Sequence, residues 1–272
     1  MLRPVAIVTA SALGLAIVLT SANKAAPGWE VWACLAVALA AASGAVFAYG
    51  VQRWRELTAL RSGHVRELFR PLGALFLVVL LLVVLALVLS PNPFSSWRGW
   101  GLSTIACVGA LPATVTMLGI RRSAGTLDGG PGTRVATLIS FRRLLRRLLG
   151  AVGLLVALAT LALGASPAPL SSRGVVLIFG SNGSLLVALA YVPARAALRE
   201  AATRLCDDLL PFGDADDAAT VISRADERAK LEQVLEVDHN LMTDLQTGLV
   251  ILGPLLSSAA TAFLPGSTGP GG

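Results

Sequence analysis

Charged side chains are scarce in this sequence. Of its 272 residues, 14% are Asp, Glu, Lys or Arg and 55% are hydrophobic, whereas soluble domains usually carry about 25% charged residues. The mean hydropathy of +0.73 agrees with this bias. The composition therefore excludes an ordinary soluble domain and predicts a polytopic membrane protein.

Residues that carry covalent chemistry are also few. The three cysteines, Cys34, Cys107 and Cys206, form neither a CxxC motif nor a disulfide framework, so we expect all of them to be reduced. There is no HExxH motif, and GSNGS (residues 180–184) lacks the GxSxG spacing of a nucleophile elbow. Residues 128–132 (DGGPG) lack the Gly-Lys-Ser/Thr of a phosphate loop and predict a flexible turn. We expect no enzyme activity and no cofactor.

Histidine is equally rare, since His64 and His239 lie in separate polar segments. Asp238, His239 and Asp244 are close in sequence and offer metal-ligand atoms. An isolated acidic group of this kind is more typical of a solvated surface. We therefore expect no metal site.

Long apolar runs, in contrast, are abundant. A helix needs roughly 17–25 mainly apolar residues to cross a hydrocarbon core about 30 Å thick. Continuous Leu, Val and Ala runs without polar alternation exclude a membrane barrel, which leaves helices. The sequence predicts an all-α bundle of about seven transmembrane helices, at residues 5–22, 31–49, 72–89, 102–120, 148–165, 175–192 and 247–264.

Ionisable residues are missing from these predicted spans, apart from Glu30 at the outer edge of the second one. Glu30 lies between Trp29 and Trp32, a pattern typical of a solvated residue beside an interfacial aromatic belt. Proton relays and ion coupling use ionisable groups inside the membrane. Their scarcity disfavours a proton-driven transporter.

Basic residues are concentrated on one of the two predicted sides of the membrane. Nineteen of the 22 lysines and arginines fall on the side of Arg3, and only Lys24, Arg98 and Arg173 fall on the other. Short loops rich in Lys and Arg stay in the cytoplasm. The sequence predicts a multi-pass protein of the cytoplasmic (inner) membrane, with the N terminus inside and the C terminus outside.

The first apolar segment has a second interpretation. Arg3 followed by an apolar run and by Thr20-Ser21-Ala22 resembles a secretory signal with a small-residue cleavage site. Cleavage would leave six helices and every other loop on the same side. Against cleavage, Arg3-Pro4 matches Arg70-Pro71 at the start of the third predicted span.

An internal repeat organises the predicted bundle. SPNPFSS (residues 90–96) and SPAPLSS (residues 166–172) each follow a long apolar run, and residues 66–96 match residues 142–172 at 13 of 31 positions. Each copy covers the same part of a helical hairpin, so the second and third of three hairpins form a parallel repeat. The two tags are predicted to be outer turns, where proline ends the preceding helix.

The sixth predicted span is interrupted by Gly180, Ser181, Asn182, Gly183 and Ser184. Glycine weakens a helix, and interrupted spans in transporters open around a substrate or ion. The alternative is a packing face on which small residues let helices approach and Asn182 bonds across the interface. Pro112 and Thr114, at the corresponding place in the fourth span, complete this candidate midplane polar site.

Two segments on the predicted inner side carry opposite charge. Residues 121–147 hold seven basic residues and one acidic residue, and residues 194–245 hold twelve acidic and six basic ones. In the first segment, Arg142, Arg143, Arg146 and Arg147 share one helix face and are expected to contact anionic lipid head groups. The second segment is expected to be a helical hairpin. It is either solvated or docked on the basic segment.

Periodicity predicts the helices of this second segment. Leu198, Ala202, Leu205 and Leu209 recur on one side, which continues the sixth helix to about residue 210. A further helix is predicted to begin at Ser223, which has capping-box spacing to Asp226, with Leu231, Val234 and Leu235 on its apolar face.

The sequence thus predicts four parts: a bundle of three helical hairpins (1–193), a cytoplasmic charged helical segment (194–245), a final helix (246–264) and a disordered Gly/Pro tail (265–272). The expected function is a non-enzymatic membrane interaction or scaffold protein. The alternative is a channel or facilitator for a small neutral or weakly polar solute. The expected partners are the bilayer and, through residues 194–245, a second copy or another protein, but not nucleic acid.

Overall fold

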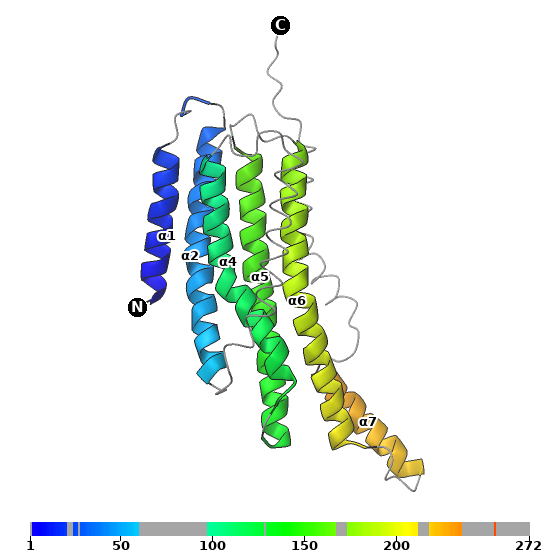
Figure 1. Ribbon diagram of the computed structural model, residues 1–272. Helices are drawn as coiled ribbons and strands as arrows, with labels where there is room; N and C mark the ends of the chain where they lie inside the picture. The colour runs from blue at the N-terminus through cyan, green and yellow to red at the C-terminus, as the bar shows by residue number, and fades with distance from the viewer. Residues whose placement is uncertain are drawn as a thin grey trace.

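The computed structural model describes residues 2–20, 24–26, 28–59, 97–127, 129–166, 173–211, 218–235 and 253. Its described part contains helices and no strand, which confirms the all-helical prediction. Figure 1 shows the long helices lying side by side. The helices are α1 (Leu2–Leu19), α2 (Trp29–Ala59), α4 (Trp97–Ala124), α5 (Pro131–Gly164), α6 (Arg173–Leu209) and α7 (Ala218–Val234).

Three of the described helices are long and apolar enough to cross a membrane, at Trp29–Thr58, Gly99–Ala124 and Pro131–Gly164. A shorter apolar helix covers Pro4–Leu19. The predicted span at 72–89, the first copy of the repeat and all but Gly253 of the last span lie outside the described residues. The count of seven and the repeat arrangement therefore stay predictions, as do the four parts of the chain.

Several helices extend beyond the predicted spans. α2 continues to Ala59, α5 begins already at Pro131, and α6 continues to Leu209. Residues 121–147 are therefore mostly helical instead of a loop. These extensions carry apolar residues at helical spacing, so packing against a neighbour stabilises them beyond the predicted spans.

The turn between α4 and α5 is short and lies where DGGPG predicted one. Gly129 has φ of 107°, a conformation that glycine adopts without steric cost. Pro131 occupies the first turn of α5, where its missing N–H loses no helical hydrogen bond. Arg134 Nε donates to the Gly129 carbonyl at 3.0 Å and fastens the turn to α5.

The helices pack in a simple order. α1 lies against α2, α2 against α4 and α5, α4 against α5 and α6, α5 against α6, and α7 against α6. One apolar core runs through the bundle, and Leu39, Met117, Leu148, Leu155 and Val187 are among its fully buried side chains.

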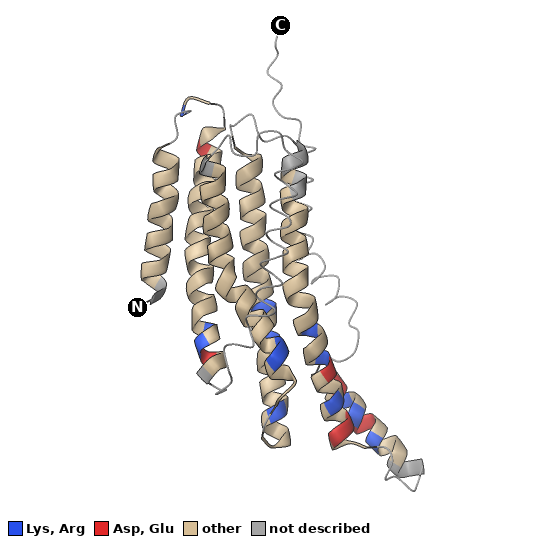
Figure 2. Ribbon diagram, viewed as in Figure 1, with Lys and Arg blue, Asp and Glu red and all other residues tan. Residues whose placement is uncertain are grey.

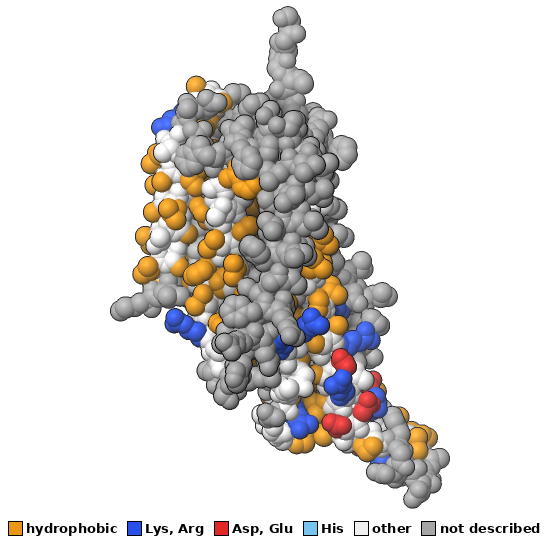
Figure 3. Space-filling model, in the orientation of Figure 1, with side chains coloured by type: hydrophobic (Ala, Val, Ile, Leu, Met, Phe, Trp, Pro, Cys, Tyr) orange, Lys and Arg blue, Asp and Glu red, His pale blue; other side chains and the backbone are white. Residues whose placement is uncertain are grey.

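Large apolar side chains also cover much of the outer surface. Figure 3 shows hydrophobic side chains in orange over the coloured part of the upper bundle, with most charged side chains toward its lower end. Soluble monomers rarely expose extended apolar patches, whereas a lipid-facing surface requires them. The large exposed apolar residues of α1, α2, α4, α5 and α6 are Val5, Val8, Leu13, Leu15, Leu19, Val31, Val108, Leu111, Leu154, Leu185, Leu189 and Val192.

Glycines allow the first helices to approach closely. A Cβ at Gly50 of α2 would lie 2.6 Å from the backbone nitrogen of Ala113 in α4. A Cβ at Gly109 of α4 would lie 2.8 Å from the backbone Cα of Ser43 in α2, and one at Gly44 would lie 2.5 Å from the carbonyl oxygen of Ala6 in α1. Backbone atoms cannot rotate aside, so a larger residue forces the helices apart.

We expect Gly50→Ala to lower the free energy of unfolding by about 1–3 kcal/mol, because the added methyl group overpacks the contact between α2 and α4. Gly150→Ala in α5 is the matched control, since a Cβ there meets nothing within 4 Å. The control should be neutral or stabilising by up to about 1 kcal/mol through helix propensity. Thermal unfolding in detergent micelles measures both. Equal effects would contradict the close approach of α2 and α4.

Candidate functional site

The polar interruption at residues 180–184 is helical throughout, in the upper half of α6. Gly180 and Ser184 are buried, whereas Ser181, Asn182 and Gly183 are half-buried. Neither two glycines nor an asparagine opens the helix here, because neighbouring helices support it. The backbone carbonyls therefore stay in helical hydrogen bonds and do not form an unwound ligand site.

Gly183 meets α5 at close range. A Cβ at Gly183 would lie 2.2 Å from Cγ1 of Val156, so the glycine makes room for this β-branched side chain. Close contact at small residues is the usual way in which membrane helices associate. Ser184 Oγ is buried without a hydrogen-bond partner. These contacts match the packing interpretation of GSNGS more closely than the ligand-site interpretation.

Pro112 and Thr114 have different neighbours from GSNGS. Pro112 lies in the middle of α4, against Gly50 of α2, and Figure 1 shows α4 changing direction along its length. Proline is a common cause of such a bend because it removes a helical hydrogen bond. Thr114 Oγ1 donates to the Leu111 carbonyl of its own helix at 2.8 Å. That the two segments form one midplane site stays a prediction.

Thr116 makes the polar contact that the sequence did not reveal. Its hydroxyl lies 2.7 Å from the Pro112 carbonyl and 3.3 Å from the Gly50 carbonyl of α2. A threonine two positions from the predicted one therefore joins α2 to α4 beside the bend. Its burial, with no side-chain surface exposed, follows from the rotation of α4, which the sequence alone does not give.

Figure 2 shows basic and acidic side chains gathered at the lower end of the bundle, on the lower parts of α2, α5 and α6 and on α7. We name this region the charged end. Among the four arginines predicted to contact lipid, Arg142 is half-buried, and Arg143, Arg146 and Arg147 are exposed. The positive charges acting on Arg142 are those of Arg146 and of two α6 residues, Arg195 and Arg199.

The sequence contains a signal for the two α6 arginines. Arg195 and Arg199 are four residues apart on the continuation of the sixth helix, as Arg142 and Arg146 are on α5. Residues at this spacing share a helix face. Only the contact between α5 and α6 shows that the two faces meet.

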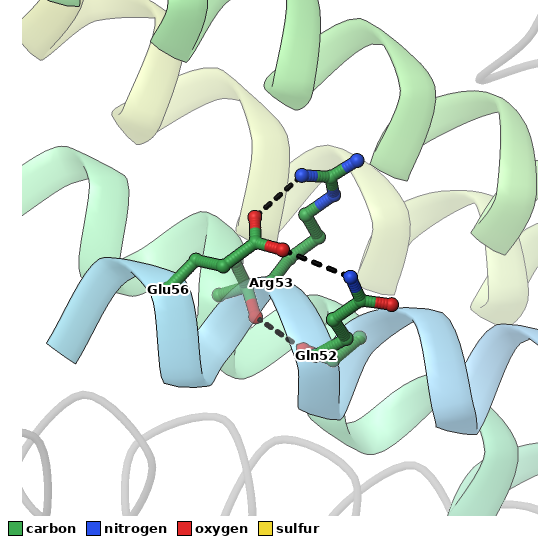
Figure 4. A network of polar contacts seen from close by, with 5 residues as sticks. Gln52, Arg53 and Glu56 are labelled. Carbon is green, nitrogen blue, oxygen red and sulfur yellow. Dashed lines mark hydrogen bonds and ion pairs between the residues drawn. The ribbon is translucent and has the colours of Figure 1, made fainter. Parts of the chain in front are cut away.

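Arg53 of α2 has a different environment, shown in Figure 4. Its guanidinium pairs with Glu56 on the next turn, and Gln52 Nε2 donates to the other carboxylate oxygen at 3.0 Å. The Arg53 guanidinium also lies 5.3 Å from the ring centre of Tyr49, at cation–π distance. The Arg53 guanidinium thus has a carboxylate and an aromatic face as neighbours within its own helix, while its Nε atom is buried without a hydrogen-bond partner.

An ion pair and a hydrogen bond link α7 to the end of α6. Arg228 of α7 bridges Asp207 of α6 at 2.7 Å and Glu232 of its own helix at 2.8 Å. The hydrogen bond with Glu232 is the main cause that raises the pKa of Arg228. Arg224 donates to the Pro211 carbonyl at 2.7 Å. We name α7 and the part of α6 after residue 194 the charged arm.

The charged arm confirms one sequence prediction and corrects another. Leu198, Ala202 and Leu205 are buried along one side of α6, as their periodicity predicted. The predicted start of the second helix at Ser223 was wrong, because α7 begins at Ala218 and Ser223 lies inside it. Leu235 is buried, but Val234 is 58% exposed and does not belong to the apolar face.

One ion pair joins the two oppositely charged segments. Arg134, at the start of α5, lies 3.9 Å from Asp208 of α6. The pair is partly exposed to solvent, so its contribution to stability is small, about 0–1 kcal/mol. It shows that the basic and acidic segments are neighbours at the charged end.

No group of three or more His, Cys, Asp or Glu side chains within the described ranges is arranged to hold a metal ion. Asp238, His239 and Asp244 lie outside these ranges.

Comparison of the chain with protein-family models, curated proteins and solved structures gives no match.

The contact between Gly183 and Val156 predicts a compensating pair of substitutions. Gly183→Ala should cost about 1–3 kcal/mol of unfolding free energy, because the new methyl group overlaps the valine. Val156→Ala removes the overlapping atoms, so the double variant should be more stable than additivity predicts by about 0.5 kcal/mol or more. Thermal unfolding of the four proteins measures this coupling. Strict additivity would show that these residues do not touch.

Cys206 reports whether α7 is docked. Its side chain is fully buried, and burial is the main cause that raises the pKa of its thiol, so little reactive thiolate forms near neutral pH. In a Cys34→Ser, Cys107→Ser background we expect slow maleimide labelling. Arg228→Glu, which faces Asp207 and Glu232 with a like charge, should raise the labelling rate severalfold.

Lys230→Glu is the matched control for this charge reversal. Lys230 pairs only with Asp226 among the ion pairs described, within α7 and on its exposed side. Labelling of Cys206 should not change in this variant. Rapid labelling of the unaltered arm would contradict the docking of α7 on α6.

Proposed function

We propose that this chain is a non-enzymatic membrane interaction or scaffold protein. The observation that carries the proposal is the regular, packed helix at residues 180–184, with Gly183 fitted against Val156. A transported solute needs a polar path through the bundle. In the segment best suited to supply one, the contacts are those of helix packing.

The charged arm supplies the part of the protein that meets other molecules. It extends α6 beyond the apolar belt and carries α7 at its end, held by Arg228 and Asp207 (Figures 1 and 2). α7 exposes Ile222 and Val234 together with several charged residues. A helix with both kinds of exposed side chain suits a protein partner or the arm of a second copy.

The proposed orientation places the charged end in the cytoplasm of a cell bounded by an inner membrane, with the N terminus inside and the C terminus outside. The excess of basic residues on that side supports it. The exposed Arg143 and Arg147 then lie at the level of anionic lipid head groups, where each basic residue contributes about 1 kcal/mol of attraction.

A channel or facilitator for a small neutral or weakly polar solute is the second candidate. One observation favours it: the buried Ser184 hydroxyl has no hydrogen-bond partner, and half-buried Asn182 is two residues away. Residues two positions apart point to nearly opposite sides of a helix, so each group offers a separate hydrogen-bonding site to a solute that passes along its own side of α6.

Flux through proteoliposomes separates the two candidates. We expect urea and glycerol to cross liposomes holding the purified chain no faster than protein-free liposomes, and Asn182→Leu to change nothing. A known facilitator reconstituted in parallel verifies the assay. Flux above the protein-free rate that Asn182→Leu abolishes would contradict the scaffold proposal and support the facilitator.

Removal of residues 214–236 tests the role of the charged arm. We expect the bundle to remain folded and either its oligomeric state or the set of proteins crosslinked to it in cells to change. Lys230→Glu serves as a control that alters charge without removing α7. If neither the oligomeric state nor the crosslinked set changes, the arm is not an interaction element.

A further inference from the structure

Four arginines from two helices lie together beside the contact between α5 and α6. Arg142 and Arg146 belong to α5, and Arg195 and Arg199 belong to α6. The charges of the other three all repel that of Arg142. The two arginines of each helix are four residues apart and share a helix face. The contact thus brings four positive charges to one place.

The two pairs also match in depth. Each helical residue advances about 1.5 Å, so Arg146 and Arg195 lie about 3–5 Å beyond the predicted ends of their apolar spans, at residues 148 and 192. Arg142 and Arg199 lie about 9–11 Å beyond the same ends. The polar region on each side of a bilayer core is about 5–8 Å thick. The depth of the lipid phosphates therefore lies between the depths of these two pairs of arginines.

Arg142 is the innermost member of the group. Its side chain is half-buried, and its Nη1 atom is buried without a hydrogen-bond partner. The apolar residues Leu138, Phe141 and Leu145 on the same helix are buried around it. A buried donor without an acceptor is unfavourable, as is the convergence of like charges.

We infer that Arg142, Arg146, Arg195 and Arg199 form a binding site for a phosphate group between α5 and α6. A phosphate supplies acceptor oxygens to the buried Nη1 and negative charge to all four side chains. Guanidinium groups bind phosphate through two parallel hydrogen bonds, which an ammonium group cannot do. Four arginines suit a ligand with two phosphates or one doubly charged phosphate. The inference rests on the proposed membrane orientation, but not on the scaffold role.

Two sources supply this chemistry: the head group of an anionic lipid and a soluble phosphate compound. The depth of the arginines favours the lipid, because basic pockets between membrane helices on the cytoplasmic side bind multiply charged head groups. The exposed Arg143 and Arg147 attract any anionic surface without selecting a ligand. The inferred site differs from them in having a buried donor and contributions from two helices.

Native mass spectrometry of the full chain in a non-ionic detergent tests the site. In one arm the protein is titrated with diphosphatidylglycerol, which carries two phosphates, and with phosphatidylcholine as the neutral control. In the other arm it is titrated with inorganic pyrophosphate. Arg142→Gln and Arg195→Gln are compared with Arg143→Gln and Arg147→Gln, which remove the same charge from the exposed positions.

We expect saturable binding of one diphosphatidylglycerol that Arg142→Gln or Arg195→Gln weakens by about tenfold, the effect of losing one charged hydrogen bond. The exposed variants should weaken it less than about twofold, as screened surface charges do. Arg142→Lys should also weaken binding, because it keeps the charge but loses the paired hydrogen bonds. If Arg142→Gln does not fold, the half-buried Arg195→Gln alone is compared with the two exposed variants.

The outcomes separate the sources and the alternatives. If Arg142→Gln and Arg195→Gln selectively weaken binding of diphosphatidylglycerol, the result supports a head-group site. If they selectively weaken binding of pyrophosphate alone, the result supports a soluble ligand. Equal loss in all four glutamine variants, or no saturable binding in either arm, overturns the site. A failure of this kind leaves the flux and arm-deletion results unchanged, so it is distinct from a failure of the scaffold proposal.

Discussion

Close approach of helices across small residues is the constraint on which the rest of the bundle depends. Gly44 brings α1 onto α2, Gly50 and Gly109 join α2 to α4, and Gly183 fits α6 onto α5. At such contacts dispersion forces act over short distances, which is the main source of association where lipid is as apolar as the protein. The buried hydroxyls of Ser43 and Thr160 bond within their own helices, that of Thr160 to the Val156 carbonyl at 2.7 Å. The interior is therefore held by shape and not by charge.

Charge has a different role at the lower end of the molecule. The helices continue past the apolar belt and remain packed through Leu138, Leu145 and Leu198, so the arginines that accompany them are held in fixed places. Arg53 and Arg228 have carboxylate partners. Arg142 instead faces other arginines. Arg228 therefore links the arm to α6 through a carboxylate of the chain itself. The surroundings of Arg142, in contrast, are suited to an anion.

The pattern of the sequence predicted those structural features that depend on a single segment of the chain. Three of the apolar spans, the continuation of α6 through Leu198, Ala202 and Leu205, and the turn at Gly129 follow from local sequence, and the structure shows them. The rotation of neighbouring helices does not follow from local sequence. For that reason the contact of Gly50 with Pro112, the role of Thr116 and the meeting of Arg142 with Arg195 were missed. The start of α7 was misplaced because a serine with capping-box spacing also occurs inside helices.

The central claim is that the glycine- and serine-containing part of α6 is a packed helix and not an opened ligand site. Amide hydrogen exchange of the full chain in lipid nanodiscs tests it most directly. The account predicts that residues 180–184 exchange as slowly as residues 185–190 that follow them in the same helix, because both are hydrogen-bonded and shielded from water. Fast exchange confined to residues 180–184 would contradict it and indicate an opened, water-accessible segment.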